Sequence, residues 1–148
     1  MKPHEKELLQ EELRLLQDAK KILEYSYHEC QRIGIKESYT FEELDKFEAL
    51  TSRFARTSDV LIQKTFRLID RIELESPGSV IDRIHRAERR SLISSADLFK
   101  EIRRIRNDID HEYIPGIIEL IFEKVLQLTP QLIDSIERVE RYCDKYCK

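Results

Sequence analysis

The chain has 148 residues, of which 41% are hydrophobic, enough for one core and too few for two. Its formal net charge of -3 excludes the strongly basic domains that bind nucleic acid through overall charge, so any RNA contact must be local. Only 3 glycines and 4 prolines accompany 37% charged residues, and this composition predicts a single all-α domain over residues 1–148.

The first predicted helix covers residues 6–33. Leu9, Leu16, Leu23 and Cys30 recur at every seventh position and therefore share one helix face. Gly34 predicts the end of this helix. The N-terminal residues lack the apolar stretch of a signal peptide, and no segment approaches the roughly 18 apolar residues of a membrane span, so we expect a cytoplasmic protein without membrane contact.

The second predicted helix, residues 41–74, begins at a capping box formed by Thr40 and Glu43. Its apolar and small residues alternate at spacings of three and four: Leu44, Phe47, Thr51, Phe54, Ser58, Leu61, Thr65, Leu68 and Ile72. This spacing is typical of a helix that packs against neighbours in a bundle.

Three more helices are predicted after the loop at residues 76–79. Ser79 with Asp82 predicts the start of a short third helix. The fourth covers residues 95–110, and the fifth covers residues 115–146, where Pro130 is expected to kink or break it. Five helices joined by short loops predict an antiparallel bundle.

Residues 106–113 carry the chain's most informative chemistry. Arg106, His111 and Tyr113 lie at the predicted end of the fourth helix. Arginine offers a forked set of donors that fits phosphate oxygens, and histidine transfers protons near neutral pH. On an uninterrupted helix Arg106 and His111 point about 140° apart. They can address one phosphate only if the helix unwinds near Asp110, or if a second copy supplies one of the groups.

The pattern R-x4-H-x-Y, read here as Arg106, His111 and Tyr113, resembles the signature of HEPN-domain ribonucleases. With the run LTSRFARTSD at residues 50–59, nearly the whole chain resembles the HepT branch of that superfamily. The resemblance implies a homodimer whose two motifs share a cleft. It also implies a toxin of a type VII-like toxin–antitoxin pair, neutralised by an MNT-type minimal nucleotidyltransferase that AMPylates Tyr113.

One position departs from this family. Asp110 stands where the family usually has a small residue. Its carboxylate can pair with Arg106 one turn earlier, or raise the proton affinity of His111.

These residues permit the ribose 2'-hydroxyl to attack the adjacent phosphorus, with His111 moving the proton and Arg106 binding the charge that builds on the phosphoryl oxygens. The route leaves a 2',3'-cyclic phosphate and needs neither metal nor cofactor. Asn107 and Asp110 are the supporting candidates, and Asn107 can orient the imidazole or donate to the phosphate. Weaker candidates for binding the RNA backbone are Arg53, Arg56, Arg103 and Arg104.

Several of the candidate residues also have an interpretation without a catalytic or metal-binding role. His111 can be a histidine at a helix C-terminus, where its cation meets the negative end of the helix dipole. Tyr113, besides being a modification site, can stack on or position a base, or can be a packed aromatic. Cys143 and Cys147, four residues apart, are better explained as packed cysteines than as a metal site. The basic residues of the third and fourth helices track RNA, bind an acidic partner, or form a solvated face: Arg83, Arg86, Arg89, Arg90, Lys100, Arg103, Arg104 and Arg106.

The alternative function belongs to another class. The chain can be a non-catalytic helical subunit that binds substrate for a minimal nucleotidyltransferase or acts as its scaffold, with the same fold and the same dimer.

Overall fold

The computed structural model describes residues 1–111 and 116–147, and within them every regular element is a helix. The elements in chain order are α1 (Pro3–Ile33), α2 (Phe41–Asp59), the π-helical turn η1 (Val60–Thr65), α3 (Phe66–Ile72), α4 (Val80–Arg89), α5 (Ala96–His111) and α6 (Ile117–Cys147). Because α2, η1 and α3 follow one another as one rod, the prediction of an all-α bundle of five helices is confirmed for this part of the chain.

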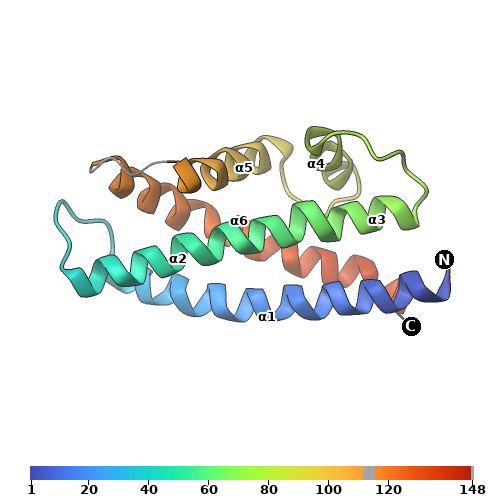
Figure 1. Ribbon diagram of the computed structural model, residues 1–148, viewed down its shortest axis with the longest axis horizontal. Coiled ribbons are helices and arrows are strands. Elements are labelled where there is room, and N and C mark those ends of the chain that lie inside the picture. Colours follow the sequence, from blue (N-terminus) through green and yellow to red (C-terminus); the bar gives the residue numbers. More distant parts are fainter. Residues whose placement is uncertain (112–115, 148) are drawn as a thin grey trace.

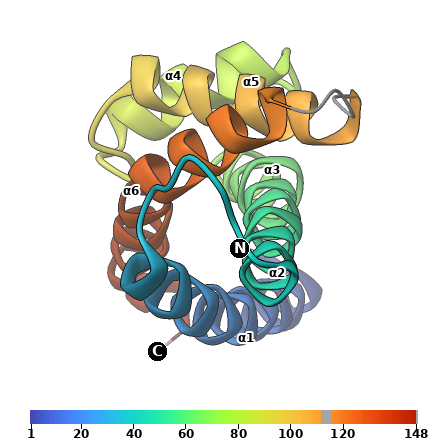
Figure 2. The same cartoon turned by 90° about the vertical axis from the view of Figure 1, so that its left-hand side faces the viewer.

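Three long rods form the body of the molecule. α1 runs antiparallel to the α2–η1–α3 rod and to α6, and α4 and α5 lie on the far side of those two rods from α1 (Figure 1, Figure 2). The predicted face of α1 is the buried one, since Leu9, Leu16, Leu23 and Cys30 have no exposed surface. No helix of the described residues is long and apolar enough to cross a membrane.

The predicted helix boundaries are set by the expected residues. Thr40 accepts a hydrogen bond from the backbone N–H of Glu43 at 3.2 Å, and the Glu43 carboxylate accepts one from the N–H of Thr40 at 3.0 Å. Ser79 and Asp82 form the second capping box, at the start of α4. Gly34 ends α1 with a φ of 74°, a conformation that favours glycine.

The second predicted helix differs locally from expectation, and in the last helix one of the two expectations for Pro130 is wrong. The second predicted helix contains a π-helical turn, where the Thr65 hydroxyl donates to the Val60 carbonyl at 3.2 Å. Such turns insert one extra residue and occur frequently at functional sites. Pro130 does not break the last helix: α6 continues through it, with Thr129 and Leu132 on either side fully buried.

A cluster of ion pairs joins α3 to α4. Asp70, which is 4% exposed, accepts hydrogen bonds from Arg90 at 2.5 Å and from Arg86 at 3.2 Å. Arg90 also donates to Glu73 at 2.8 Å. Arg86 and Arg90 are therefore neither solvated nor placed to track an RNA backbone, because both hold α4 against α3.

Candidate functional site

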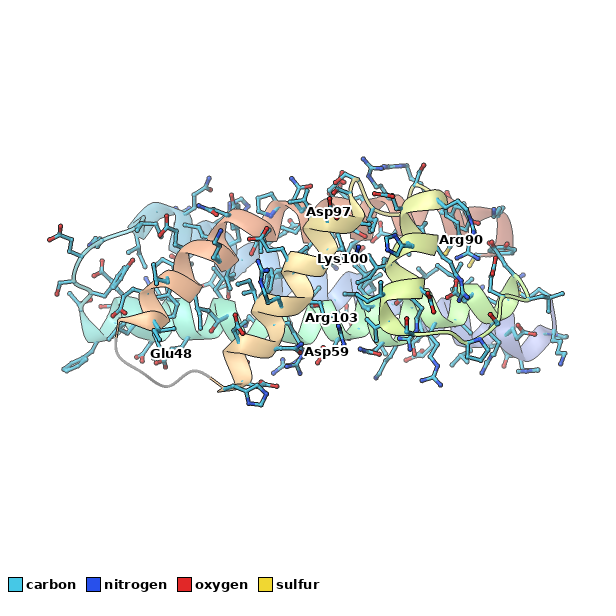
Figure 3. All side chains as sticks on the ribbon, turned by 90° about the horizontal axis from the view of Figure 1, so that it is seen from above. Glu48, Asp59, Arg90, Asp97, Lys100 and Arg103 are labelled. Atoms are coloured by element: carbon cyan, nitrogen blue, oxygen red, sulfur yellow. The ribbon has the colours of Figure 1, made fainter. Side chains whose placement is uncertain are left out.

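The candidate site is built around Arg106, whose guanidinium is fixed by an ion pair with Asp59. Arg106 lies on α5 and faces Asp59, the last residue of α2. Its Nε and Nη2 groups donate to the two carboxylate oxygens of Asp59 at 2.6 Å and 2.8 Å. A bidentate pair of this kind fixes the plane of the guanidinium as well as its position. Figure 3 shows Asp59 beside Arg103, where α5 crosses the α2–η1–α3 rod.

Asp110 binds the same arginine from the other side. Its carboxylate accepts a hydrogen bond from Nη1 of Arg106, so the first of the two expectations for Asp110 is confirmed. Hydrogen bonds to Asp59, and then to Asp110, raise the pKa of the Arg106 guanidinium above its ordinary value. The hydrogen bond from Arg106 lowers the pKa of Asp110, so this pair is fully charged at neutral pH. Three of the five N–H groups of Arg106 are engaged, and two remain for a ligand.

A small cavity of about 70 Å³ lies beside Arg106. It is lined by Ser58, Asp59, Ile62, Gln63, Arg103, Arg106 and Asn107. Two predicted residues, Asn107 and Arg103, therefore share this cavity with Arg106. Arg103, Arg106 and Asp59 line this cavity, and Asp110 is bonded to Arg106. The formal charges of these two arginines and two carboxylates cancel.

His111 is exposed on the last turn of α5 and lies apart from this cavity. Because α5 is helical through His111, the helix does not unwind at Asp110, and that route to a shared phosphate is wrong. Five residues of helix separate Arg106 from His111 by about 7.5 Å along the axis and about 140° around it. Within one chain the two side chains therefore face different directions.

The other predicted residues are dispersed. Tyr113 lies outside the described residues. Arg53 donates to the Ser26 hydroxyl, and Arg56 lines a separate cavity between α1 and α2. Arg104 is exposed and lies 4.0 Å from Glu101. Of the four proposed RNA-binding arginines, only Arg103 shares the cavity of Arg106.

Sequence reasoning missed Asp59 as the residue that positions Arg106. The available signal was the run at residues 50–59, which ends at Asp59 and carries part of the family resemblance. Nothing in the sequence, however, indicates that Asp59 pairs with an arginine 47 positions later.

Two of the three cysteines, Cys30 and Cys143, are buried, and Cys147 is partly exposed. Burial raises the pKa of the Cys143 thiol to about 12, so Cys143 is protonated at neutral pH. Residues 1–111 and 116–147 contain no group of three or more His, Cys, Asp or Glu side chains placed to bind a metal ion.

Comparison of the chain with protein-family models, with curated proteins and with solved structures gives no match. The resemblance to the HEPN superfamily therefore rests on the motif residues and on the run at residues 50–59.

Proposed function

We propose that this chain is a metal-independent endoribonuclease, a HepT-like toxin that acts in the cytoplasm as a homodimer. The observation that carries the proposal is the Asp59–Arg106 pair. Asp59 holds the guanidinium side-on, and with the bond to Asp110 counted two N–H groups remain free beside a cavity that Arg103 and Asn107 also line. A fixed cation with free donors is what the developing charge on a phosphoryl oxygen requires.

The direction of His111 makes the proposed site a composite one. Since His111 points away from Arg106 of its own chain, the histidine that serves Arg106 comes from a second copy, as in a symmetric dimer with two equivalent sites. His111 takes the proton of the ribose 2'-hydroxyl as its oxygen attacks phosphorus, and Arg106 stabilises the phosphoryl oxygens. The bond from phosphorus to the 5'-oxygen breaks, and this oxygen leaves with the electron pair and takes a proton from the His111 imidazolium or water. The other product ends in a 2',3'-cyclic phosphate.

An MNT-type nucleotidyltransferase is the proposed antitoxin, and this part of the proposal rests on the resemblance alone. The phenolic oxygen of Tyr113 attacks the α-phosphorus of ATP and pyrophosphate leaves. The added phosphate is negatively charged and lies close in sequence to Arg106, so it competes with RNA for the arginine. The intact mass of the chain after incubation with the partner and ATP tests this step.

The experiment that tests the nuclease uses the purified full chain, single-stranded RNA and excess EDTA. We expect cleavage products with 2',3'-cyclic phosphate ends, and a decrease in rate of about 10²- to 10⁴-fold for His111→Gln, which removes the proton-transfer group. Circular dichroism should show the same helicity for both proteins, because His111 is exposed at a helix end. Equal cleavage by both proteins would assign the activity to a contaminant.

Asp110 competes with RNA for Arg106 in this proposal. We expect Asp110→Ala to raise kcat/KM by about two- to fivefold, a modest factor because Asp110 is half exposed and its ion pair is weak. Asp108→Ala is the matched control, since it removes a carboxylate from the same helix end without a bond to Arg106. The measurement is the cleavage rate at RNA concentrations below KM. A decrease with Asp110→Ala would make Asp110 a supporting residue rather than a competitor.

One observation favours the second candidate, a non-catalytic partner of a minimal nucleotidyltransferase. The two carboxylates at Arg106 cancel the positive charge that RNA binding needs. If the chain copurifies with such an enzyme, yet neither Asp110→Ala nor wild type cleaves RNA, the scaffold is the function.

A further inference from the structure

Three arginines gather where α4 and α5 lie across the α2–η1–α3 rod. Arg67 belongs to the rod, Arg83 to α4 and Arg103 to α5, and α4 contacts both η1 and α5. Figure 3 shows Arg103 on the side of α5 that faces α4. Three separate elements therefore bring positive charge to one region of the surface.

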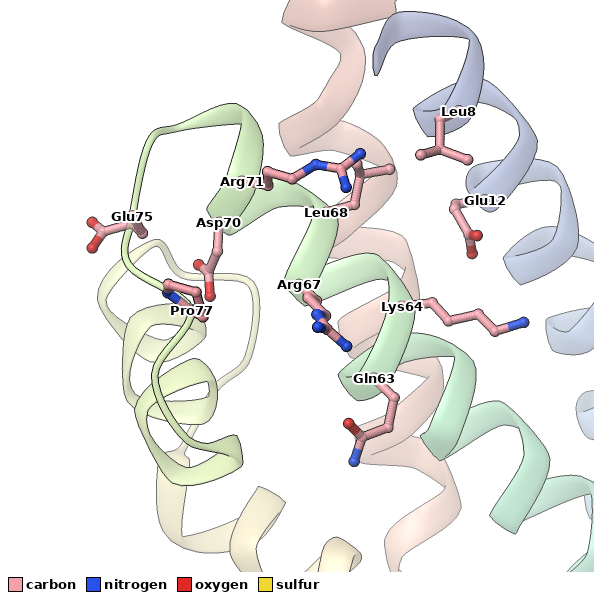
Figure 4. Close-up of a pocket in the computed structure, with 10 residues that line it drawn as sticks. All are labelled: Leu8, Glu12, Gln63, Lys64, Arg67, Leu68, Asp70, Arg71, Glu75 and Pro77. Carbon is pink, nitrogen blue, oxygen red and sulfur yellow. The ribbon is translucent and has the colours of Figure 1, made fainter. Parts of the chain in front are cut away.

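Gln63, on the π-helical turn η1, connects the three arginines. Its side-chain oxygen accepts a hydrogen bond from Nη1 of Arg83 at 2.9 Å. Arg67 follows Gln63 by four residues, so the two side chains are neighbours on the rod. Figure 4 shows both on the side of the rod away from α1, whereas Lys64 points toward α1. Gln63 also lines the cavity of the candidate site together with Arg103.

The three arginines have no carboxylate partner in the described part of the chain. Among the ion pairs formed by residues 1–111 and 116–147, none involves Arg67, Arg83 or Arg103. Asp59 and Asp70 lie on the same rod, but each is already paired with other arginines. The positive charge of the three side chains is therefore not neutralised within this part of the protein.

Two further carboxylates lie near Arg67 without pairing with it. Glu12 and Glu75 line the cavity of about 380 Å³ that Arg67 also lines. Glu75 pairs with the arginines of α4, at 2.9 Å from Arg89. Glu12 belongs to α1, and Figure 4 shows it across from the rod on the side toward which Lys64 points.

Arg83 shows the electrostatic consequence of this crowding. Its Nε–H is buried and has no acceptor among the described residues. Burial, and then the positive charge of Arg67, lower the pKa of the Arg83 guanidinium; Arg86 and Arg103 act in the same direction, against the opposing charge of Asp70. Like charges held together without a counter-ion destabilise one another, so binding of an anion between them is favoured.

The position of this group relative to the candidate site indicates which anion it binds. Arg103 precedes Arg106 by three residues on α5, so their side chains lie on adjacent turns of one helix face. Gln63 lines both the cavity beside Arg106 and the neighbouring cavity at Arg67. A strand whose scissile phosphate lies at Arg106 therefore meets the three arginines next.

We propose that Arg67, Arg83 and Arg103 bind the phosphate that neighbours the scissile one in the same RNA strand. The forked N–H groups of arginine match phosphate oxygens, and three of them approach from three elements. Gln63 orients Arg83 for this contact. The inference rests on the proposed nuclease and adds a second phosphate-binding group to it. This group supplies the positive charge that Asp59 and Asp110 cancel at the motif itself.

The first test compares two substrates in excess EDTA. A dinucleoside monophosphate contains only the scissile phosphate, whereas an oligoribonucleotide also contains its neighbours. We expect Arg67→Gln and Arg83→Gln each to lower kcat/KM about tenfold for the oligoribonucleotide and less than about twofold for the dinucleoside monophosphate. Arg67 is exposed, so Arg67→Gln retains the fold even if Arg83→Gln does not. Equal losses for both substrates would overturn the proposal.

Arg71→Gln is the matched control. It removes the same charge one turn further along the rod, where the side chain is exposed and points toward α1 in Figure 4. We expect it to cleave both substrates as wild type does. A loss equal to that of Arg67→Gln would mean that RNA responds only to overall charge, and the proposed site would then be wrong.

Binding of a strand that cannot be cleaved separates this inference from the proposed function. A 2'-O-methyl oligoribonucleotide lacks the attacking hydroxyl. We expect Arg67→Gln and Arg83→Gln each to weaken its binding about tenfold, and to reduce the slope of log Kd against log salt by about 0.7, the contribution of one phosphate contact. If wild type cleaves no RNA but binds this strand through the two arginines, the nuclease is wrong and the site stands. If both variants bind the strand as wild type does, the site is wrong, whether or not wild type cleaves RNA.

Discussion

Mixing Arg106→Ala and His111→Ala proteins should restore about a quarter of wild-type cleavage, although each variant alone is inactive. The reason is the continuous helix between the two residues, which turns His111 away from Arg106 of the same chain. In a mixed dimer, one composite site has lost both groups and the other has kept both. With random exchange of subunits, half of the dimers are mixed and each has one working site.

The measurement is the cleavage rate after subunits exchange in mild urea and refold. A matched control mixes wild type with the double variant Arg106→Ala/His111→Ala. Here every site of a mixed dimer lacks one group, so activity falls to about a quarter of that of wild type alone at the same total concentration. If both residues act within one chain, the first mixture stays inactive and the control retains about half, and the composite site is then wrong.

The fold was largely predictable because the residues that determine each helix lie close together in the sequence. The seven-residue recurrence of Leu9, Leu16 and Leu23 selects one face of a helix, and that face is buried. The capping boxes at Thr40 and Ser79 act within four residues of chain, so the sequence contains both partners of each contact. Periodicity and caps together are sufficient for helix number and boundaries.

Contacts between distant helices could not be predicted in the same way. A run of arginines interleaved with acidic residues is typical of a solvated helix face. Arg86 and Arg90, however, donate hydrogen bonds to the buried Asp70, 16 and 20 positions earlier. The sequence likewise contains two adjacent apolar lines on α1, and only the packing of the rods decides that Leu16 is buried while Leu15 remains exposed. The π-helical turn has no sequence signature of its own.

In the candidate site, too, the local features could be predicted from the sequence and the tertiary contacts could not. The motif itself places Arg106 and His111 on one helix, and the helix period alone predicts their divergence. The pairing with Asp59 comes from the crossing of α5 over the α2–η1–α3 rod, which is a tertiary feature. The chemical types at the site were therefore predictable, whereas the group that positions the arginine was not.

Asp70→Asn should lower the free energy of unfolding by about 3 kcal/mol or more. Asp70 is 4% exposed and is shared by two arginines whose side chains are only 8% and 12% exposed. Asparagine has the shape of aspartate but no charge. Arg86 and Arg90 then lie close together in a site that excludes water, with less negative charge to offset their own. Glu73 and Glu75 remain as partners of the two arginines, but their side chains are 21% and 32% exposed, so they replace only part of the charge that the buried Asp70 supplies. Urea unfolding followed by circular dichroism at neutral pH measures it.

Glu75→Gln is the matched control for this prediction. Glu75 belongs to the same cluster, but its side chain is 32% exposed and its shortest ion pair, at 2.9 Å, is with Arg89, which is 64% exposed. Its distances to Arg86 and Arg90 are longer, 3.5 Å and 3.6 Å. Solvent screens such a pair, so the expected loss is below about 1 kcal/mol. High salt should reduce the Glu75 effect further while leaving most of the Asp70 effect, because buried pairs are screened far less. Equal losses for the two variants would mean that water enters the cluster, and α4 would then be held by its apolar residues Ile84 and Ala87 instead.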